Sequence, residues 1–160
     1  MNCHTFLAAL VPGLTACAST YAPPASLAPA ATYATTMAPA AILATARREL
    51  TAQGFAVVSA DAEAGTLSTA PRDWPLTPAQ ADCGTTLGLD YLKDSRTARR
   101  LSWHVVAVSG RVTLRAAIEA DYRPGAVDQN ITLTCTSRGE LERDFAGRIG
   151  LAPTPQEATR

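Results

Sequence analysis

The sequence predicts a small α+β domain: an antiparallel sheet of about five strands with two helices packed on one face. Two long segments near residues 101 and 112 alternate apolar and polar residues, which predicts neighbouring, half-exposed strands. Two other segments, near residues 42 and 141, have apolar residues three or four positions apart and predict helices. The expected order over residues 39–150 is therefore helix, two strands, loop, three strands and helix.

The first helix is expected over residues 39–53. Pro39 suits a first helical turn, and Gly54 supplies a stop. The apolar residues between them recur at helical spacing: Ile42, Leu43, Ala46 and Leu50. The following residues, 55–69, predict a hairpin of two strands with its turn at 61–65.

The segment 71–98 begins with a proline-rich stretch and has no clear apolar period, so we expect it to be mostly loop. Clean alternation begins at Leu101 and predicts a strand that ends at a Ser-Gly turn at 109–110. A longer strand with apolar residues from position 112 to 120 follows this turn. The next strand is expected over residues 131–136, whose threonines suit a pleated surface.

Ser137 and Glu140 have the spacing of a capping box, which predicts that the closing helix begins there. Its buried stripe is formed by apolar residues four positions apart: Leu141, Phe145 and Ile149. Residues 142–144 are charged and are expected on the exposed side of this helix. Gly150 ends the helix, and residues 151–160 are expected to form a disordered tail.

Residues 1–16 contain an apolar block of signal-peptide length that is too short to span a bilayer. The block leads to Leu14-Thr15-Ala16-Cys17, which resembles the lipobox of bacterial lipoproteins. In that family the cysteine becomes the lipid-modified first residue of the mature chain and carries acyl chains such as palmitate. The resemblance covers only this segment, and it implies a signal peptide over 1–16 and lipid attachment at Cys17. The alternatives are a chance cysteine after an N-terminal core helix and a domain secreted without lipidation.

Residues 17–38 are nearly all alanine, proline, serine and threonine, without charge, and predict a disordered spacer before the folded domain. The resemblance also implies a place in the cell. Ala18 is not the aspartate that usually retains lipoproteins at the inner membrane, so the implied location is the outer membrane, facing the periplasm.

Processing at Cys17 leaves two cysteines in the mature domain, Cys83 in the expected loop and Cys135 on a strand. An even pair in an exported domain predicts a disulfide that ties the loop to the sheet. Two buried thiols are the alternative. No metal site is expected, because there is no Cys-x-x-Cys spacing and the histidines are His4 and His104 alone.

The 14 basic and 14 acidic side chains balance, so no nucleic-acid partner is expected. No glycine-rich phosphate loop is present, and no cofactor is expected. No catalytic motif surrounds His104, so we expect a protein that is not an enzyme. The alternative is a small periplasmic hydrolase or processing enzyme that uses His104 as its base.

The high arginine content suggests binding of an anionic ligand, because arginine supplies 13 of the 14 basic residues and its guanidinium group suits anions. The candidate anion-binding residues are Arg99, Arg100, Arg111 and Arg115. Arg111 and Arg115 share the exposed face of one expected strand, and a guanidinium group binds carboxylates and phosphates through forked hydrogen bonds. The alternative is an ordinary solvated sheet face. The chain is thus predicted to be a lipid-anchored envelope protein with a non-catalytic binding or scaffolding domain, whose partner is an envelope protein, an anionic lipid or a cell-wall polymer.

Overall fold

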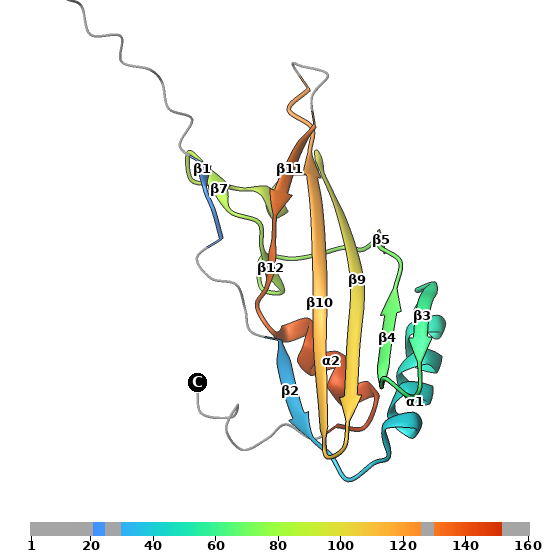
Figure 1. Ribbon diagram of the computed structural model, residues 1–160. Coiled ribbons are helices and arrows are strands. Elements are labelled where there is room, and N and C mark those ends of the chain that lie inside the picture. The colour runs from blue at the N-terminus through green and yellow to red at the C-terminus, as the bar shows by residue number, and fades with distance from the viewer. Residues whose placement is uncertain (1–20, 25–29, 126–129, 152–160) are drawn as a thin grey trace, which may run out of the picture.

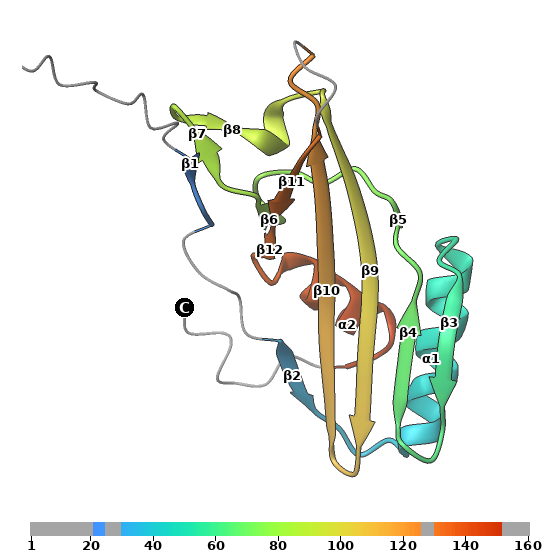
Figure 2. The same cartoon turned by 45° about the horizontal axis from the view of Figure 1, so that its top comes forward.

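The structure, a computed structural model, describes residues 21–24, 30–125 and 130–151. Its centre is a seven-stranded antiparallel sheet with both helices on one face, while no described element covers the other face, called the uncovered face below (Figure 1). Two small sheets, of three and two strands, accompany it, and the three-stranded one lies near the end of the long central strands (Figure 2). Strands account for 43% of the described residues. The prediction of an α+β domain with a sheet of about five strands was therefore wrong, because the protein is mostly β and its main sheet is larger.

The main sheet is built on a hairpin of two twelve-residue strands, β9 (Thr97–Val108) and β10 (Arg111–Tyr122). The tight turn between them uses Gly110 at φ 76°, a backbone conformation that glycine adopts without strain. Alternation buries one face of each strand, so that Val105 and Leu114 are 1% and 0% exposed. Both strands were predicted, and each is longer at its ends than its apolar pattern indicated.

Helix α1 (Pro39–Ala52) and the hairpin of β3 (Val57–Asp61) and β4 (Thr66–Thr69) confirm the predicted elements. α1 packs its buried stripe against β9, β3 and β4. The helix ends at Gly54, where φ is 83° and the next residue donates its backbone N–H to the carbonyl of Leu50 at 2.9 Å. β4 then pairs with β9 and extends the sheet.

One strand of the sheet comes from the segment that was predicted to be a spacer. β2 (Ala31–Ala34) pairs with Arg111–Leu114 of β10, and Tyr33 is 1% exposed in the core. The prediction of disorder over residues 17–38 therefore does not hold for residues 31–34. A four-residue strand with a single large apolar side chain is too short to show a period against its alanine-rich surroundings.

The segment 71–98 also holds more structure than the loop that was predicted. It contains β5 (Arg72–Asp73), β6 (Ala81–Asp82), β7 (Thr85–Thr86), β8 (Leu89–Asp90) and the 3-10 helix η1 (Tyr91–Lys93). β5 joins the main sheet beside β9, β6 pairs with β12 (Thr136–Ser137), and β7 lies between β8 and β1 (Tyr21–Ala22). Strands of two residues are invisible to any periodicity argument, so the prediction of loop was wrong for these residues.

An ion pair holds the turn between η1 and β9. Arg96 Nη2 lies 2.6 Å from Asp94 Oδ2, and its guanidinium lies 5.0 Å from the centre of the Tyr122 ring. The side-chain hydrogen bonds from Arg96 lower the pKa of the Asp94 carboxyl to about 2. The same bonds raise the pKa of Arg96, and the pair joins the turn to the Tyr122 ring at the end of β10.

Helix α2 (Glu140–Arg148) packs against β10 and β2. Its predicted apolar stripe is buried, and the Phe145 ring lies 4.6 Å from the Trp103 ring of β9. Leu151, expected at the start of a disordered tail, is 4% exposed and belongs to the core. Within the described part of the chain, neither helix has the length and apolar character needed to cross a membrane.

Candidate binding site

Strand β10 lacks a neighbouring strand along part of one edge. β2 pairs with Arg111–Leu114, and β11 (Ile131–Thr134) pairs with Glu119–Tyr122 on the same edge. No strand among the described residues pairs with residues 115–118 of this edge. The main sheet is therefore interrupted beside the middle of its longest hairpin.

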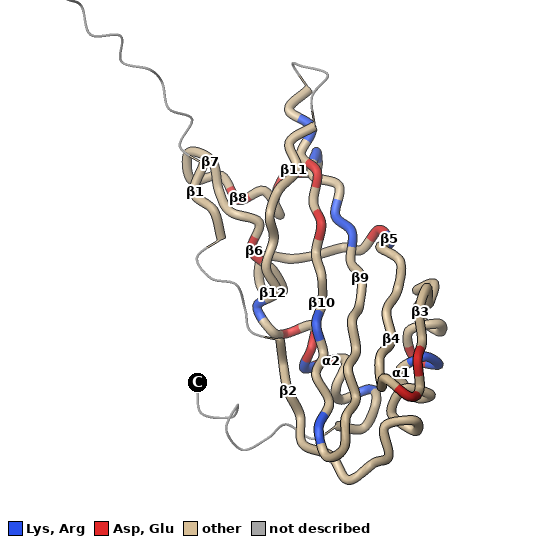
Figure 3. Tube along the Cα trace, viewed as in Figure 1, with Lys and Arg blue, Asp and Glu red and all other residues tan. Residues whose placement is uncertain are grey.

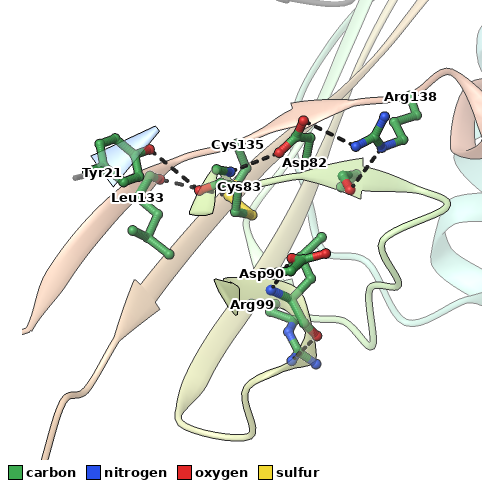
Figure 4. The surroundings of a disulfide bond; sticks show 11 residues. Tyr21, Asp82, Cys83, Asp90, Arg99, Leu133, Cys135 and Arg138 are labelled. Carbon is green, nitrogen blue, oxygen red and sulfur yellow. Dashed lines mark hydrogen bonds and ion pairs between the residues drawn. A yellow bond between two sulfur atoms is a disulfide. The ribbon is translucent and has the colours of Figure 1, made fainter. Parts of the chain in front are cut away.

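The disulfide between Cys83 and Cys135 lies where the chain leaves the main sheet after β11. After β11 the chain turns away at Cys135, which is bonded to Cys83, and β12 pairs with β6 rather than with β10 (Figure 4). Arg138 strengthens the same connection, since its Nη2 lies 3.1 Å from Asp82 Oδ2. The predicted disulfide is confirmed.

A glutamate from α2 occupies the open edge. Glu142 Oε1 accepts a hydrogen bond from the backbone N–H of Ala116 at 3.0 Å, and Glu142 Oε2 accepts one from the Ser137 hydroxyl at 2.5 Å. The carboxylate thus replaces the carbonyl of a missing neighbouring strand. Glu142 is 4% exposed, so the expectation that residues 142–144 lie on the exposed side of the helix was wrong for Glu142.

These contacts also replace the predicted capping box. The N-cap position is occupied by Gly139 at φ 83°, and α2 has no hydrogen bond from a side-chain cap. Ser137 Oγ accepts the backbone N–H of Gly139 at 3.0 Å while its hydroxyl donates to Glu142. The capping box of Ser137 and Glu140 was therefore wrong, because Ser137 bonds a glutamate two positions further along.

The gap leads into a cavity of about 700 Å3. Thr136, Ser137 and Glu142 are buried and form its floor. Arg115 and His104 are exposed and stand at its mouth, on the uncovered face of the sheet. Most of the other lining residues are small or apolar, among them Val106, Ala117, Ile118 and Cys135. An apolar cavity of this size with a few convergent polar groups is typical of small-molecule sites.

Two of the four candidate arginines lie together on the uncovered face. Arg111 and Arg115 are four positions apart on β10, and both are exposed. Figure 3 marks the basic positions along this strand in blue. Among the ion pairs of the described residues, none involves Arg111 or Arg115. Arg115 stands directly opposite His104 in the register of β9 and β10. This end of the face is therefore basic and lacks a neutralising carboxylate.

The other two candidate arginines are already engaged elsewhere. Arg99 Nη2 donates to two backbone carbonyls of the preceding turn, at 2.6 and 3.1 Å, and so holds that turn against β9. Arg100 Nη2 lies 2.9 Å from Asp121 Oδ2 and 3.4 Å from Glu119 Oε2. Of the predicted set, Arg111 and Arg115 lie on the same strand, and their guanidinium groups have no hydrogen-bond partner among the described residues.

His104, the residue of the enzymatic alternative, stands next to Ser68 of β4 in the sheet register. Within the described residues its ring forms no hydrogen bond with a serine, a cysteine or a carboxylate, so nothing around it assigns it a catalytic role. The described part of the chain also contains no group of three or more His, Cys, Asp or Glu side chains placed to hold a metal ion.

The predicted anchor segment lies outside the part of the chain that the structure describes. Residues 1–16, Cys17 and residues 152–160 lie outside the described residues, so the signal peptide, the lipid attachment and the tail stay predictions. Comparison of the sequence with protein-family models and with curated proteins finds no match.

Proposed function

We propose that this protein is a lipid-anchored component of a bacterial cell envelope that binds an anionic partner without catalysing a reaction. Its attachment residue is Cys17, at the end of the lipobox-like segment, and its location is the outer membrane, facing the periplasm. The disulfide between Cys83 and Cys135 supports export, because such bonds persist in oxidising compartments.

The binding role rests on one observation: the uncovered sheet face carries two exposed arginines that form no ion pair with a carboxylate of the described residues. Arg111 and Arg115 point to the same side of β10 and are about 13 Å apart along the strand. Two guanidinium groups at this spacing suit a partner with repeated anionic groups, either a carboxylate-bearing cell-wall polymer or a surface of anionic lipid.

Charge reversal on this face, Arg111→Glu with Arg115→Glu, is expected to weaken binding to the anionic partner by about tenfold or more at low salt. The measurement is co-sedimentation with cell-wall sacculi and, separately, with phosphatidylglycerol vesicles, which distinguishes the two sources of anion. The full chain with Cys17→Ser is used so that acyl chains do not themselves bind the vesicles.

The matched control reverses the same number of charges away from the face, at Arg47 and Arg48 on the exposed side of α1. It is expected to bind as the parent does. Equal binding of both double variants to sacculi and to vesicles would show that the uncovered face does not bind the anion.

Replacing Cys17 with serine is expected to move the protein from the membrane fraction to the soluble fraction. Acyl chains contribute about 0.8 kcal/mol of membrane binding per buried methylene, and the hydroxyl cannot carry the anchor. Cell fractionation and the intact mass of the protein measure this change, with Cys3→Ser as the control because Cys3 lies within the signal peptide. A Cys17→Ser protein that stays in the membrane fraction would exclude this anchor.

A further inference from the structure

The floor of the cavity holds a carboxylate whose partners are neutral. Glu142 is 4% exposed, and it accepts hydrogen bonds from the Ala116 backbone and the Ser137 hydroxyl. Within the described residues, none of the ion pairs includes Glu142. A buried carboxylate is costly unless it is paired with a cation or receives several hydrogen bonds, so this group favours a positively charged ligand.

Glu142 also keeps the hydrogen-bonding capacity that such a ligand needs. A carboxylate has about four acceptor positions, and the two bonds to Ala116 and Ser137 use one on each oxygen. An ammonium group has three donors. The remaining carboxylate positions and the Thr136 hydroxyl, which also lines the cavity, match these donors in number.

The opposite charge lies at the other end of the same cavity. Arg115 is the residue before Ala116, but strand alternation directs its side chain to the uncovered face, while Glu142 reaches β10 from the helix-covered side. Both groups line the cavity, and no ion pair joins them. The cavity therefore carries a negative group at its floor and a positive group at its mouth.

We infer that this cavity binds a zwitterion, with the ligand's ammonium group on Glu142 and its carboxylate on Arg115. The inference rests on the proposed anion binding at Arg115 and adds the second charged group of the ligand. Val106 and Ile118 also line the cavity and offer apolar surface to the chain that separates the two charges of such a ligand. A volume of about 700 Å3 accommodates an amino acid or the end of a short peptide.

Matched ligands test the inference without any mutation. The probes are γ-aminobutyrate, δ-aminovalerate and ε-aminocaproate, each compared with the acid that lacks its amino group: butyrate, valerate and caproate. Titrations of the full chain are followed by the backbone amide signals of Ala116 and Ser137, which lie at the floor. At least one amino acid of the series is expected to bind about tenfold more tightly than its matched acid, because only the amino acid forms charge-assisted hydrogen bonds with Glu142.

The variant Glu142→Gln tests the position of the ammonium group. Glutamine has nearly the same shape, and its amide oxygen can accept from Ala116 while its amide nitrogen donates to Ser137, so the fold is retained. This variant is expected to abolish the preference for the amino acid while leaving binding of the matched acid within about twofold. Glu140→Gln, on the same helix but outside the cavity lining, is the control and is expected to keep the preference.

The outcomes separate this inference from the proposed function. Equal binding of amino acid and acid, both dependent on Arg115, would overturn the zwitterion and leave anion binding intact. A preference that survives Glu142→Gln, or a series in which no ligand shifts the cavity amides, would also overturn it. The proposed anion binding itself is decided by the sacculus and vesicle measurements on the Arg111 and Arg115 variant.

Discussion

Loss of the Cys83–Cys135 disulfide is expected to lower the free energy of unfolding by about 4 kcal/mol. The bond joins residues 52 positions apart, and a cross-link over a loop of this length restricts the unfolded chain strongly. It also holds the short strands β6 and β12 together beside the main sheet. Urea unfolding of the Cys83→Ser, Cys135→Ser chain against the oxidised parent measures the difference.

The control for this experiment is Cys17→Ser, which changes a cysteine outside the bond and is expected to leave stability unchanged. A difference below about 1 kcal/mol between the double variant and the parent would contradict the prediction. It would mean that the pairing of β6 with β12 and the ion pair of Arg138 with Asp82 hold this segment without the covalent link.

Replacing Glu142 with leucine is expected to lower the free energy of unfolding by about 2 kcal/mol. Leucine offers no acceptor, so the Ala116 N–H and the Ser137 hydroxyl lose their partner, and the apolar side chain keeps water away from both. The leucine variant no longer has the desolvation cost of a buried carboxylate, and this gain offsets part of the lost stability. Thermal and urea unfolding of the full chain measure the balance.

Glu142→Gln is the matched control, because it keeps both hydrogen bonds and removes only the charge. Its stability is expected to lie within about 1 kcal/mol of the parent. If the leucine variant were instead as stable as the parent, the carboxylate would contribute nothing to the fold. The burial of this carboxylate would then be explained by ligand binding and not by stability.

The sequence predicted the elements that have length and period. α1, the β3–β4 hairpin, β9, β10 and α2 all extend over several alternations or helical turns, so their apolar residues define a face. The disulfide was predictable too, because processing at the expected lipid site leaves one pair of cysteines. The alternation of apolar and polar residues predicted that Arg111 and Arg115 lie on the exposed face of a strand, and both residues are exposed in the structure.

The rest could not be predicted, for physical reasons. Two-residue strands such as β6 and β7 depend on tertiary partners and leave no pattern in the sequence. β2 joins the sheet through a partner almost eighty positions later, since Tyr33 pairs with Val112. The edge of β10 is interrupted because β2 and β11 pair only with its two ends. The amino-acid composition of these strands does not indicate where each pairing stops.

Glu142 is the residue of the candidate site that sequence reasoning missed. It lies beside the stripe of Leu141, Phe145 and Ile149, and charge alone placed it on the exposed side. One signal was present in the sequence. Ser137 is followed by two glutamates within reach of its hydroxyl, Glu140 and Glu142, and the capping box considered only Glu140. The backbone N–H of Ala116 has no strand partner and donates to Glu142, which favours Glu142 over Glu140 as the partner of Ser137. This unpaired N–H can be recognised only in the three-dimensional structure.

The pairing of β2 with β10 has a consequence for the order of folding. β2 lies near the beginning of the described chain, yet its partner residues, 111–114, come after α1, the β3–β4 hairpin and β9. Closing so long a loop is entropically unfavourable until the central hairpin exists as a template. We therefore expect β2 to dock late, after β9 and β10 have formed, so that the newly folded sheet presents a bare edge in the meantime.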